Sequence, residues 1–91
     1  MRRIDLTKDA RQTLAKLPPK HARQIAVKIS ALAGDPLSAD SQVLKGHAPH
    51  RRADQGEYRI IYDFDENTLR VALVGKRNDD EVYKRFERKV K

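Results

Sequence analysis

Two arginines and a histidine flank a short turn sequence in the second half of the chain, where they could bind an anion. If Gln55-Gly56 is a two-residue hairpin turn, Arg52 lies opposite Arg59 and His50 lies opposite Ile61. Side chains alternate between the faces of a strand, so these four residues are expected to share one face. The other face is expected to lie under helices and takes the large apolar side chains: Tyr58, Ile60, Tyr62 and Phe64.

This arrangement predicts a phosphate site. Like charges that oppose one another across two strands are destabilising, and an anion between Arg52 and Arg59 would relieve the repulsion. The guanidinium group offers a fork of donors that matches two phosphate oxygens. The alternative is that both arginines extend into water or pair with Asp54 or Asp63.

A third arginine, Arg77, follows the last predicted strand. Simple alternation from Leu73 would put Arg77 on the face of Leu69 and Val71, whereas a bulge at Gly75 would redirect it. The sequence leaves both directions open.

Composition favours a polyanionic partner. The 91 residues include 20 Lys and Arg against 13 Asp and Glu, a net charge of +7 that attracts nucleic acid, the ribosome or an acidic protein.

There is no Cys, which excludes disulfides and thiolate chemistry, and the three scattered His suggest no metal site, so no metal or cofactor is expected. No apolar run approaches the roughly 20 residues of a membrane span, and the N-terminus lacks a signal-peptide pattern, so we expect a cytoplasmic protein without membrane association.

Hydrophobic periodicity predicts an α+β fold in one domain over residues 1–91. The expected order is β-α-α-β-β-β-α, with two N-terminal helices packed on a small, mainly antiparallel sheet. Thr7 is the expected cap of the first helix, and Pro18-Pro19 separates it from the second. Residues 35–49 are expected to form a loop from which Val43 and Leu44 enter the core. The predicted strands are 3–6, 50–53, 58–64 and 69–74, and the predicted helices are 8–17, a second that runs to about 34, and a third after Arg77.

The last helix has a polar start and an apolar stripe. Asn78 and Glu81 resemble a capping box, and Asp79 and Asp80 suit the positive end of the helix dipole. The expected stripe consists of Val82, Phe86 and Val90. His21 and His47 are expected at the surface.

Three segments together resemble the RelE/ParE toxin superfamily, on the RelE side. They are residues 44–46 (Leu-Lys-Gly), 56–62 (Gly-Glu-Tyr-Arg-Ile-Ile-Tyr) and 74–83 (Val-Gly-Lys-Arg-Asn-Asp-Asp-Glu-Val-Tyr). The two leading helices also match, so the resemblance spans nearly the whole chain. It implies a metal-independent endoribonuclease that cuts messenger RNA in the ribosomal A site. It further implies that the 2′-hydroxyl attacks the adjacent phosphate and leaves a 2′,3′-cyclic phosphate and a 5′-hydroxyl end.

The resemblance also implies roles for single residues. Arg59 would hold the scissile phosphate, Arg77 would stabilise the transition state or the leaving oxygen, and Tyr83 would stack on or orient a base. Arg52 and His50 match the basic pair on the preceding strand, where the Escherichia-type member has lysines, and this departure leaves the identity of the general base open.

Chemistry ranks the same residues. His50 is the best base by type because its ordinary pKa lies near neutrality, although it could equally be a loop-edge residue. Arginines have pKa values above about 12 and are poor proton donors, which limits Arg52, Arg59 and Arg77 to electrostatic stabilisation. A water or Tyr83 would serve the leaving group, and Tyr83 could alternatively be helix core. The further candidates for RNA binding are Lys45, Arg51 and Lys76.

The resemblance implies partners and leaves two alternatives. The expected partners are a cognate antitoxin and messenger RNA on the ribosome, with operator DNA reached only through the antitoxin complex. A ParE-like toxin would share the architecture but inhibit DNA gyrase, and an inactive member would only bind. Because ParE-like members generally lack the full set of Arg59, Arg77 and Tyr83, the sequence favours the ribonuclease.

Overall fold

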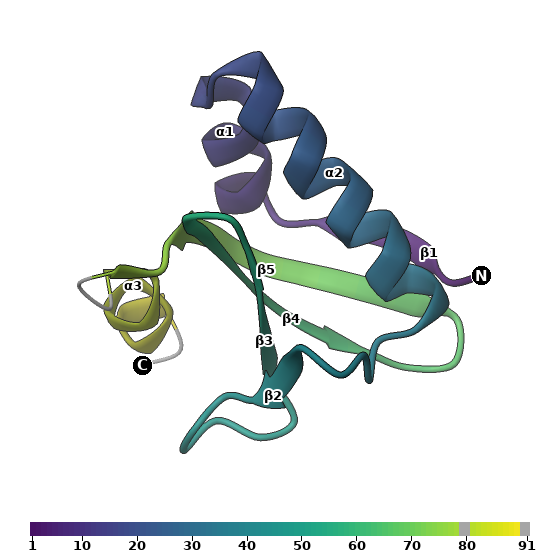
Figure 1. Cartoon of the computed structure of the whole chain (residues 1–91). Helices are drawn as coiled ribbons and strands as arrows, with labels where there is room; N and C mark the ends of the chain where they lie inside the picture. Colours follow the sequence, from purple (N-terminus) through teal and green to yellow (C-terminus); the bar gives the residue numbers. More distant parts are fainter. Residues whose placement is uncertain (79–80, 90–91) are drawn as a thin grey trace.

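A computed structural model describes residues 1–78 and 81–89 of the chain. It contains a five-stranded sheet in the order β1-β5-β4-β3-β2, in which β1 is parallel to β5 and all other neighbours are antiparallel. This confirms the predicted α+β fold, with one strand more than expected (Figure 1). The elements are β1 (Arg3–Leu6), α1 (Lys8–Lys16), α2 (Pro19–Gly34), β2 (Ser41–Val43), β3 (Arg51–Gln55), β4 (Tyr58–Phe64), β5 (Thr68–Lys76) and α3 (Glu81–Lys89).

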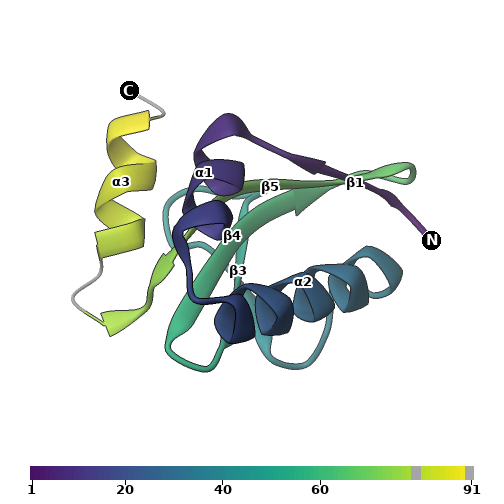
Figure 2. The same ribbon diagram turned by 90° about the horizontal axis from the view of Figure 1, so that it is seen from above.

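The first helix begins at the predicted residue and ends one residue before the predicted end, and the second ends at Gly34 as predicted. The Thr7 side chain accepts a hydrogen bond from the backbone N–H of Ala10, which satisfies one of the free donors at the start of α1. Pro18 precedes α2 and Pro19 is its first residue, because proline fits the first turn of a helix but not its interior, so α1 cannot continue through them. Both helices pack on one face of the sheet (Figure 2).

The sheet divides the core into two clusters. The larger cluster lies between the sheet and helices α1 and α2 and includes Ile25, Leu32, Ile60 and Tyr62. The smaller one lies on the opposite face, under α3: Leu44, Ile61, Leu73, Val82 and Phe86. We call these faces the α1–α2 face and the α3 face. The predicted alternation along β4 is therefore confirmed, with Ile60 and Ile61 on opposite sides.

Helix α3 is anchored at the end of β5. The guanidinium group of Arg85 donates to the Val74 carbonyl and pairs with Asp9 of α1. Val82 and Phe86 are buried as predicted. Asp79, Asp80 and Val90, which were expected to complete the start and the stripe of this helix, lie outside the described residues.

The additional strand β2 lies inside the predicted loop 35–49. Ser41 pairs with Ala53 and Val43 pairs with Arg51. Leu44 is buried as expected, but the prediction for Val43 was wrong because its side chain projects into solvent from this edge strand. Three residues, Ser-Gln-Val, carry too little hydrophobic periodicity to predict a strand, which forms here by pairing with β3.

The predicted register of the β3–β4 hairpin was wrong by two residues. The turn is Gly56-Glu57 rather than Gln55-Gly56, with Gly56 at φ +60° in its first position. Two-residue hairpin turns favour positive φ at this position, and glycine adopts it without steric cost. As a result Asp54 lies opposite Arg59, and Arg52 lies opposite Ile61.

A bulge in β5 decides the direction of Arg77. Ile61 pairs with Leu73 but Tyr62 pairs with Val71, so Ala72 is the additional residue of β5. The bulge moves Leu73 to the α3 face while Val71 stays on the α1–α2 face. Arg77 follows Leu73 in alternation and therefore points to the same side as Arg59.

Candidate anion-binding site

Arg59 and Arg77 converge on a single carboxylate, that of Asp54. Arg59 donates from Nε to Oδ1 at 2.8 Å and from a terminal nitrogen to Oδ2 at 3.4 Å, while Arg77 donates to the same Oδ2 at 3.4 Å. The three residues come from β3, β4 and the segment that follows β5, and we call them the arginine–aspartate cluster. Arg59 is the most enclosed, with 17% of its side chain exposed, against 28% for Asp54 and 53% for Arg77.

The cluster keeps Asp54 ionised. Partial burial raises the pKa of the Asp54 carboxyl, but the hydrogen bond and charge of Arg59, the hydrogen bond of Arg77 and the charge of Arg52 outweigh this, so that its pKa is lowered. Two guanidinium groups therefore surround one negative charge. A phosphodiester also carries one negative charge on two terminal oxygens, and it could accept the same hydrogen bonds.

The backbone fixes Arg77 beside the hairpin turn. Its N–H donates to the Glu57 carbonyl at 2.9 Å, so the end of β5 stays next to the β3–β4 turn. A hollow of about 300 Å³ opens here, lined by Glu57, Lys76, Arg77 and Asn78. Lys76, a predicted RNA contact, borders this hollow beside Arg77, but its pairing with Tyr58 puts it on the α1–α2 side of β5.

The two neighbouring arginines of β3 point to opposite faces. Arg52 shares the α3 face with the cluster, and its guanidinium group donates to the Gln42 side chain at 2.8 Å. Arg51 points to the α1–α2 face, where a terminal nitrogen donates to the Ser41 hydroxyl at 2.9 Å and the buried Nε has no partner among the described residues. The structure therefore does not bring Arg51 together with the other predicted site residues.

His50 and Tyr83 belong to a second group on the α3 face, which we call the aromatic cluster. The His50 ring lies 4.7 Å from the ring of Phe86. His47 was expected at the surface, but it is half-buried and packs edge-on against Phe86 and Tyr83, at 5.2 and 5.6 Å. The Tyr83 hydroxyl donates to the Lys45 carbonyl at 2.7 Å, which fixes the half-buried ring beside the exposed Lys45.

The corrected register separates His50 from Arg59. In the predicted pairing His50 was two residues before the residue opposite Arg59, whereas in the structure it is four residues before that position, just ahead of β3. At about 3.3 Å per residue this is roughly 13 Å instead of 7 Å along the strand. His50 therefore adjoins Phe86 rather than the arginine–aspartate cluster.

Sequence reasoning missed that Asp54 is the centre of the cluster, although the pairing with Arg59 was among the alternatives. The signal that could have shown it is Gly56: a glycine in the first turn position places Asp54 opposite Arg59.

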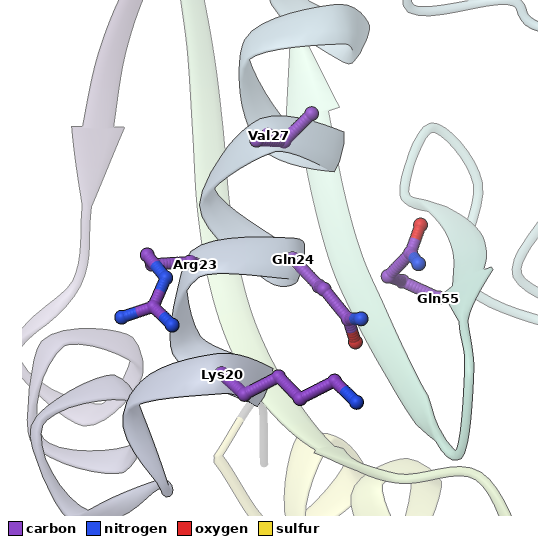
Figure 3. Close-up of a pocket in the computed structure, with 5 residues that line it drawn as sticks. All are labelled: Lys20, Arg23, Gln24, Val27 and Gln55. Atoms are coloured by element: carbon purple, nitrogen blue, oxygen red, sulfur yellow. The ribbon is translucent and has the colours of Figure 1, made fainter.

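A different hollow, of about 380 Å³, opens on the α1–α2 face between α2 and the end of β3. Its lining residues are Lys20, Arg23, Gln24, Val27 and Gln55 (Figure 3). Gln24 and Gln55 approach one another from the two elements. No predicted catalytic residue lines this hollow.

Among the described residues, no group of three potential metal ligands comes together, and no helix is long and apolar enough to cross a membrane.

Comparison with known proteins identifies the class of fold. The RelBE2 toxin–antitoxin complex of Mycobacterium tuberculosis contains a chain 28% identical to this one, with 84% of this chain and 98% of that chain covered and a TM-score of 0.74. The RelE toxin of Escherichia coli, solved as a mutant in the free state, is 23% identical over 99% of this chain and 98% of that one, with a TM-score of 0.79. The archaeal RelE–RelB complex of Pyrococcus horikoshii contains a chain 24% identical to this one. The match covers 86% of this chain and 97% of that chain, with a TM-score of 0.72. The fold is thus that of the RelE toxins.

The family follows from the sequence profile. The family described as the ParE toxin of the type II toxin–antitoxin system parDE matches residues 4–81. The chain belongs to this ParE toxin family, within the RelE/ParE superfamily. No curated protein is significantly similar to it in sequence.

Proposed function

We propose that this toxin is a ribosome-dependent endoribonuclease that cuts messenger RNA in the A site and so inhibits translation. The observation that carries the proposal is the contact of Arg59 and Arg77 with one carboxylate, within 3.4 Å of its oxygens. Two guanidinium groups that converge on one anion are the arrangement needed to hold a phosphate and to stabilise the charge that develops on it.

The proposed reaction is an internal transesterification. The 2′-oxygen forms a bond to phosphorus as the bond from phosphorus to the 5′-oxygen breaks, with a proton lost from the 2′-hydroxyl and one gained by the 5′-oxygen. Arg59 would bind the non-bridging oxygens through its Nε edge, and the more exposed Arg77 would neutralise charge in the transition state. No metal takes part in the proposed step.

The aromatic cluster would contact the RNA beside the reacting phosphate. The ring of Tyr83, held by its hydrogen bond to the Lys45 carbonyl, would stack on a base. His50, which precedes β3, lies four residues before the position opposite Arg59, roughly 13 Å along an extended chain, so we propose that it binds the RNA strand rather than accepts the 2′-hydroxyl proton. Lys45 and Lys76 are exposed and would contact phosphates.

The test is to induce the toxin alone and to map the 5′ ends of messenger RNA against the reading frame. We expect cuts in phase with translated codons, and 5′-hydroxyl ends that accept ligation only after kinase treatment. Arg59→Ala and Arg77→Ala should each lower cleavage about 100-fold or more. Arg23→Ala, which removes an exposed arginine of α2 on the other side of the sheet, is the matched control. Cleavage unchanged in both site variants would refute the proposal.

The proposed partner in the cell is an antitoxin, and the protein would reach operator DNA only in complex with it. Support comes from the Mycobacterium tuberculosis and Pyrococcus horikoshii relatives, which were solved as toxin–antitoxin complexes. Co-expression with the cognate antitoxin should restore the growth that the toxin alone inhibits.

A second candidate function is inhibition of DNA gyrase. It is favoured by the match to the ParE family profile, whereas the similar structures are RelE toxins. Induction would then trigger a DNA-damage response while messenger RNA stays intact, the opposite of the result expected for the ribonuclease.

A further inference from the structure

We propose that Asp54 is a specificity-determining residue: its carboxylate occupies the phosphate position between Arg59 and Arg77, so that only RNA held by additional contacts can displace it. This inference rests on the proposed phosphate-binding role of the two arginines and adds a residue to which no role was assigned.

The first argument is geometric. Arg59 donates both N–H groups of its Nε edge to Asp54, and this is the edge that binds a phosphate through two parallel hydrogen bonds. Only 17% of the Arg59 side chain is exposed, and Asp54 covers the edge formed by Nε and one terminal nitrogen. A phosphate cannot use the same edge until the carboxylate leaves.

The second argument is electrostatic. Asp54 and a phosphodiester each carry one negative charge. Replacing the carboxylate by a phosphate therefore leaves the net charge around Arg59 and Arg77 unchanged. If Asp54 stayed nearby, it would repel the phosphate at short range. In either case the carboxylate lowers the affinity of the two arginines for an isolated phosphate.

The third argument is that the α3 face provides a second cation for the displaced carboxylate. Arg52 lies two residues before Asp54 on the same face of β3, roughly 7 Å along the strand. The charge of Arg52 already lowers the pKa of Asp54. Rotation of the Asp54 side chain towards Arg52 would free the Nε edge of Arg59 without leaving an unpaired carboxylate.

The consequence is discrimination between substrates. A short free RNA offers few contacts besides its phosphate and competes poorly with an internal carboxylate, which has no translational entropy to lose. An RNA strand fixed on a large assembly brings further contacts that offset the displacement. Asp54 would thus restrict the toxin to RNA presented on the ribosome.

The test compares the purified wild-type toxin with Asp54→Asn for binding of a short single-stranded RNA with 2′-O-methyl groups, which this chemistry cannot cleave. We expect the variant to bind about tenfold more tightly at low salt, because one charge-assisted competitor is removed. Asp63→Asn is the matched control: Asp63 makes the same two-pronged contact with Arg70, at 3.0 and 3.2 Å, four residues along β4 from Arg59. It removes the same charge away from the cluster and should leave RNA affinity nearly unchanged.

Equal or weaker RNA binding by a folded Asp54→Asn variant would overturn the inference, since Asp54 would then only position the arginines. An equal gain in Asp63→Asn would also overturn it, because net charge alone would explain the effect. If Asp54→Asn does not fold, Asp54→Ser provides the same comparison with a smaller side chain. The two proposals can fail separately. If Asp54→Asn binds RNA more tightly but the wild-type toxin cleaves no messenger RNA in cells, the role of Asp54 is supported and the ribonuclease is refuted.

Discussion

Gly75 is a point of close approach between β5 and α3, and its replacement by alanine gives a direct test of the packing that positions the site. A Cβ atom at this position would lie 3.2 Å from Val82 Cβ and 3.2 Å from a terminal nitrogen of Arg85. Carbon atoms in contact prefer about 3.5–4.0 Å, so Val82 and the helix that carries it must move.

The expected cost follows from two opposing contributions. Overpacking of this kind destabilises the folded protein by about 1–3 kcal/mol. Replacing glycine by alanine also lowers the conformational entropy of the unfolded chain, which stabilises the folded protein by about 0.4–1 kcal/mol. The net destabilisation of Gly75→Ala should therefore lie between about 0 and 2.6 kcal/mol, with a midpoint of about 1.3 kcal/mol. For a domain of this size each 1 kcal/mol lowers the melting temperature by about 4–8 °C.

The assay is thermal unfolding followed by circular dichroism, with Gly34→Ala as the control. Gly34 ends α2, and a Cβ atom added there would meet no other atom within 4 Å, so alanine should raise the free energy of unfolding by about 0.5–1 kcal/mol. The two variants should shift the melting temperature in opposite directions. A Gly75→Ala variant that melts above the wild-type temperature would refute the close packing of β5 against α3.

Two further predictions concern single side chains. The hydrogen bond from Arg70, with those from two backbone N–H groups, lowers the pKa of Asp65 from 3.8 to about 2. Its stabilising contribution is therefore complete above about pH 4 and lost as the pH falls towards 2. Asp65→Asn should flatten the dependence of melting temperature on pH in that window, and an unchanged slope would contradict the contact. Tyr83→Phe removes the hydrogen bond to the Lys45 carbonyl and should cost about 1 kcal/mol in denaturant unfolding while it keeps the ring. If the ring stacks on RNA, Tyr83→Phe retains most cleavage activity and Tyr83→Ala does not.

Much of the fold was predictable because local signals agree with it. The Thr7 cap, the two prolines between α1 and α2 and the alternation from Tyr58 to Phe64 each act over a few residues, and each is confirmed. The strand Ser41–Val43 was not predictable, since so short an edge strand forms only when β3 lies beside it.

The arginines of the candidate site were predictable as residues but not as an arrangement. Arg59 and Arg77 were selected by charge, spacing and resemblance, and the structure brings them together. Their common partner depends on a turn that begins at Gly56, and the direction of Arg77 depends on a bulge at Ala72. A shift of two residues preserved the face of every side chain but exchanged an arginine for Asp54 opposite Arg59.

The sequence by itself determined a basic α+β chain with two leading helices, an aromatic strand and three arginines near its C-terminal strands, because composition and periodicity depend only on the order of residues. The tertiary structure alone decided that Arg59 and Arg77 share one anion, that Arg51 points away, and that His50 packs on Phe86. These outcomes depend on the register of β3 against β4 and on the bulge in β5. The register follows from the positive φ of Gly56, a local feature, whereas the bulge at Ala72 appears only when β5 lies beside β4.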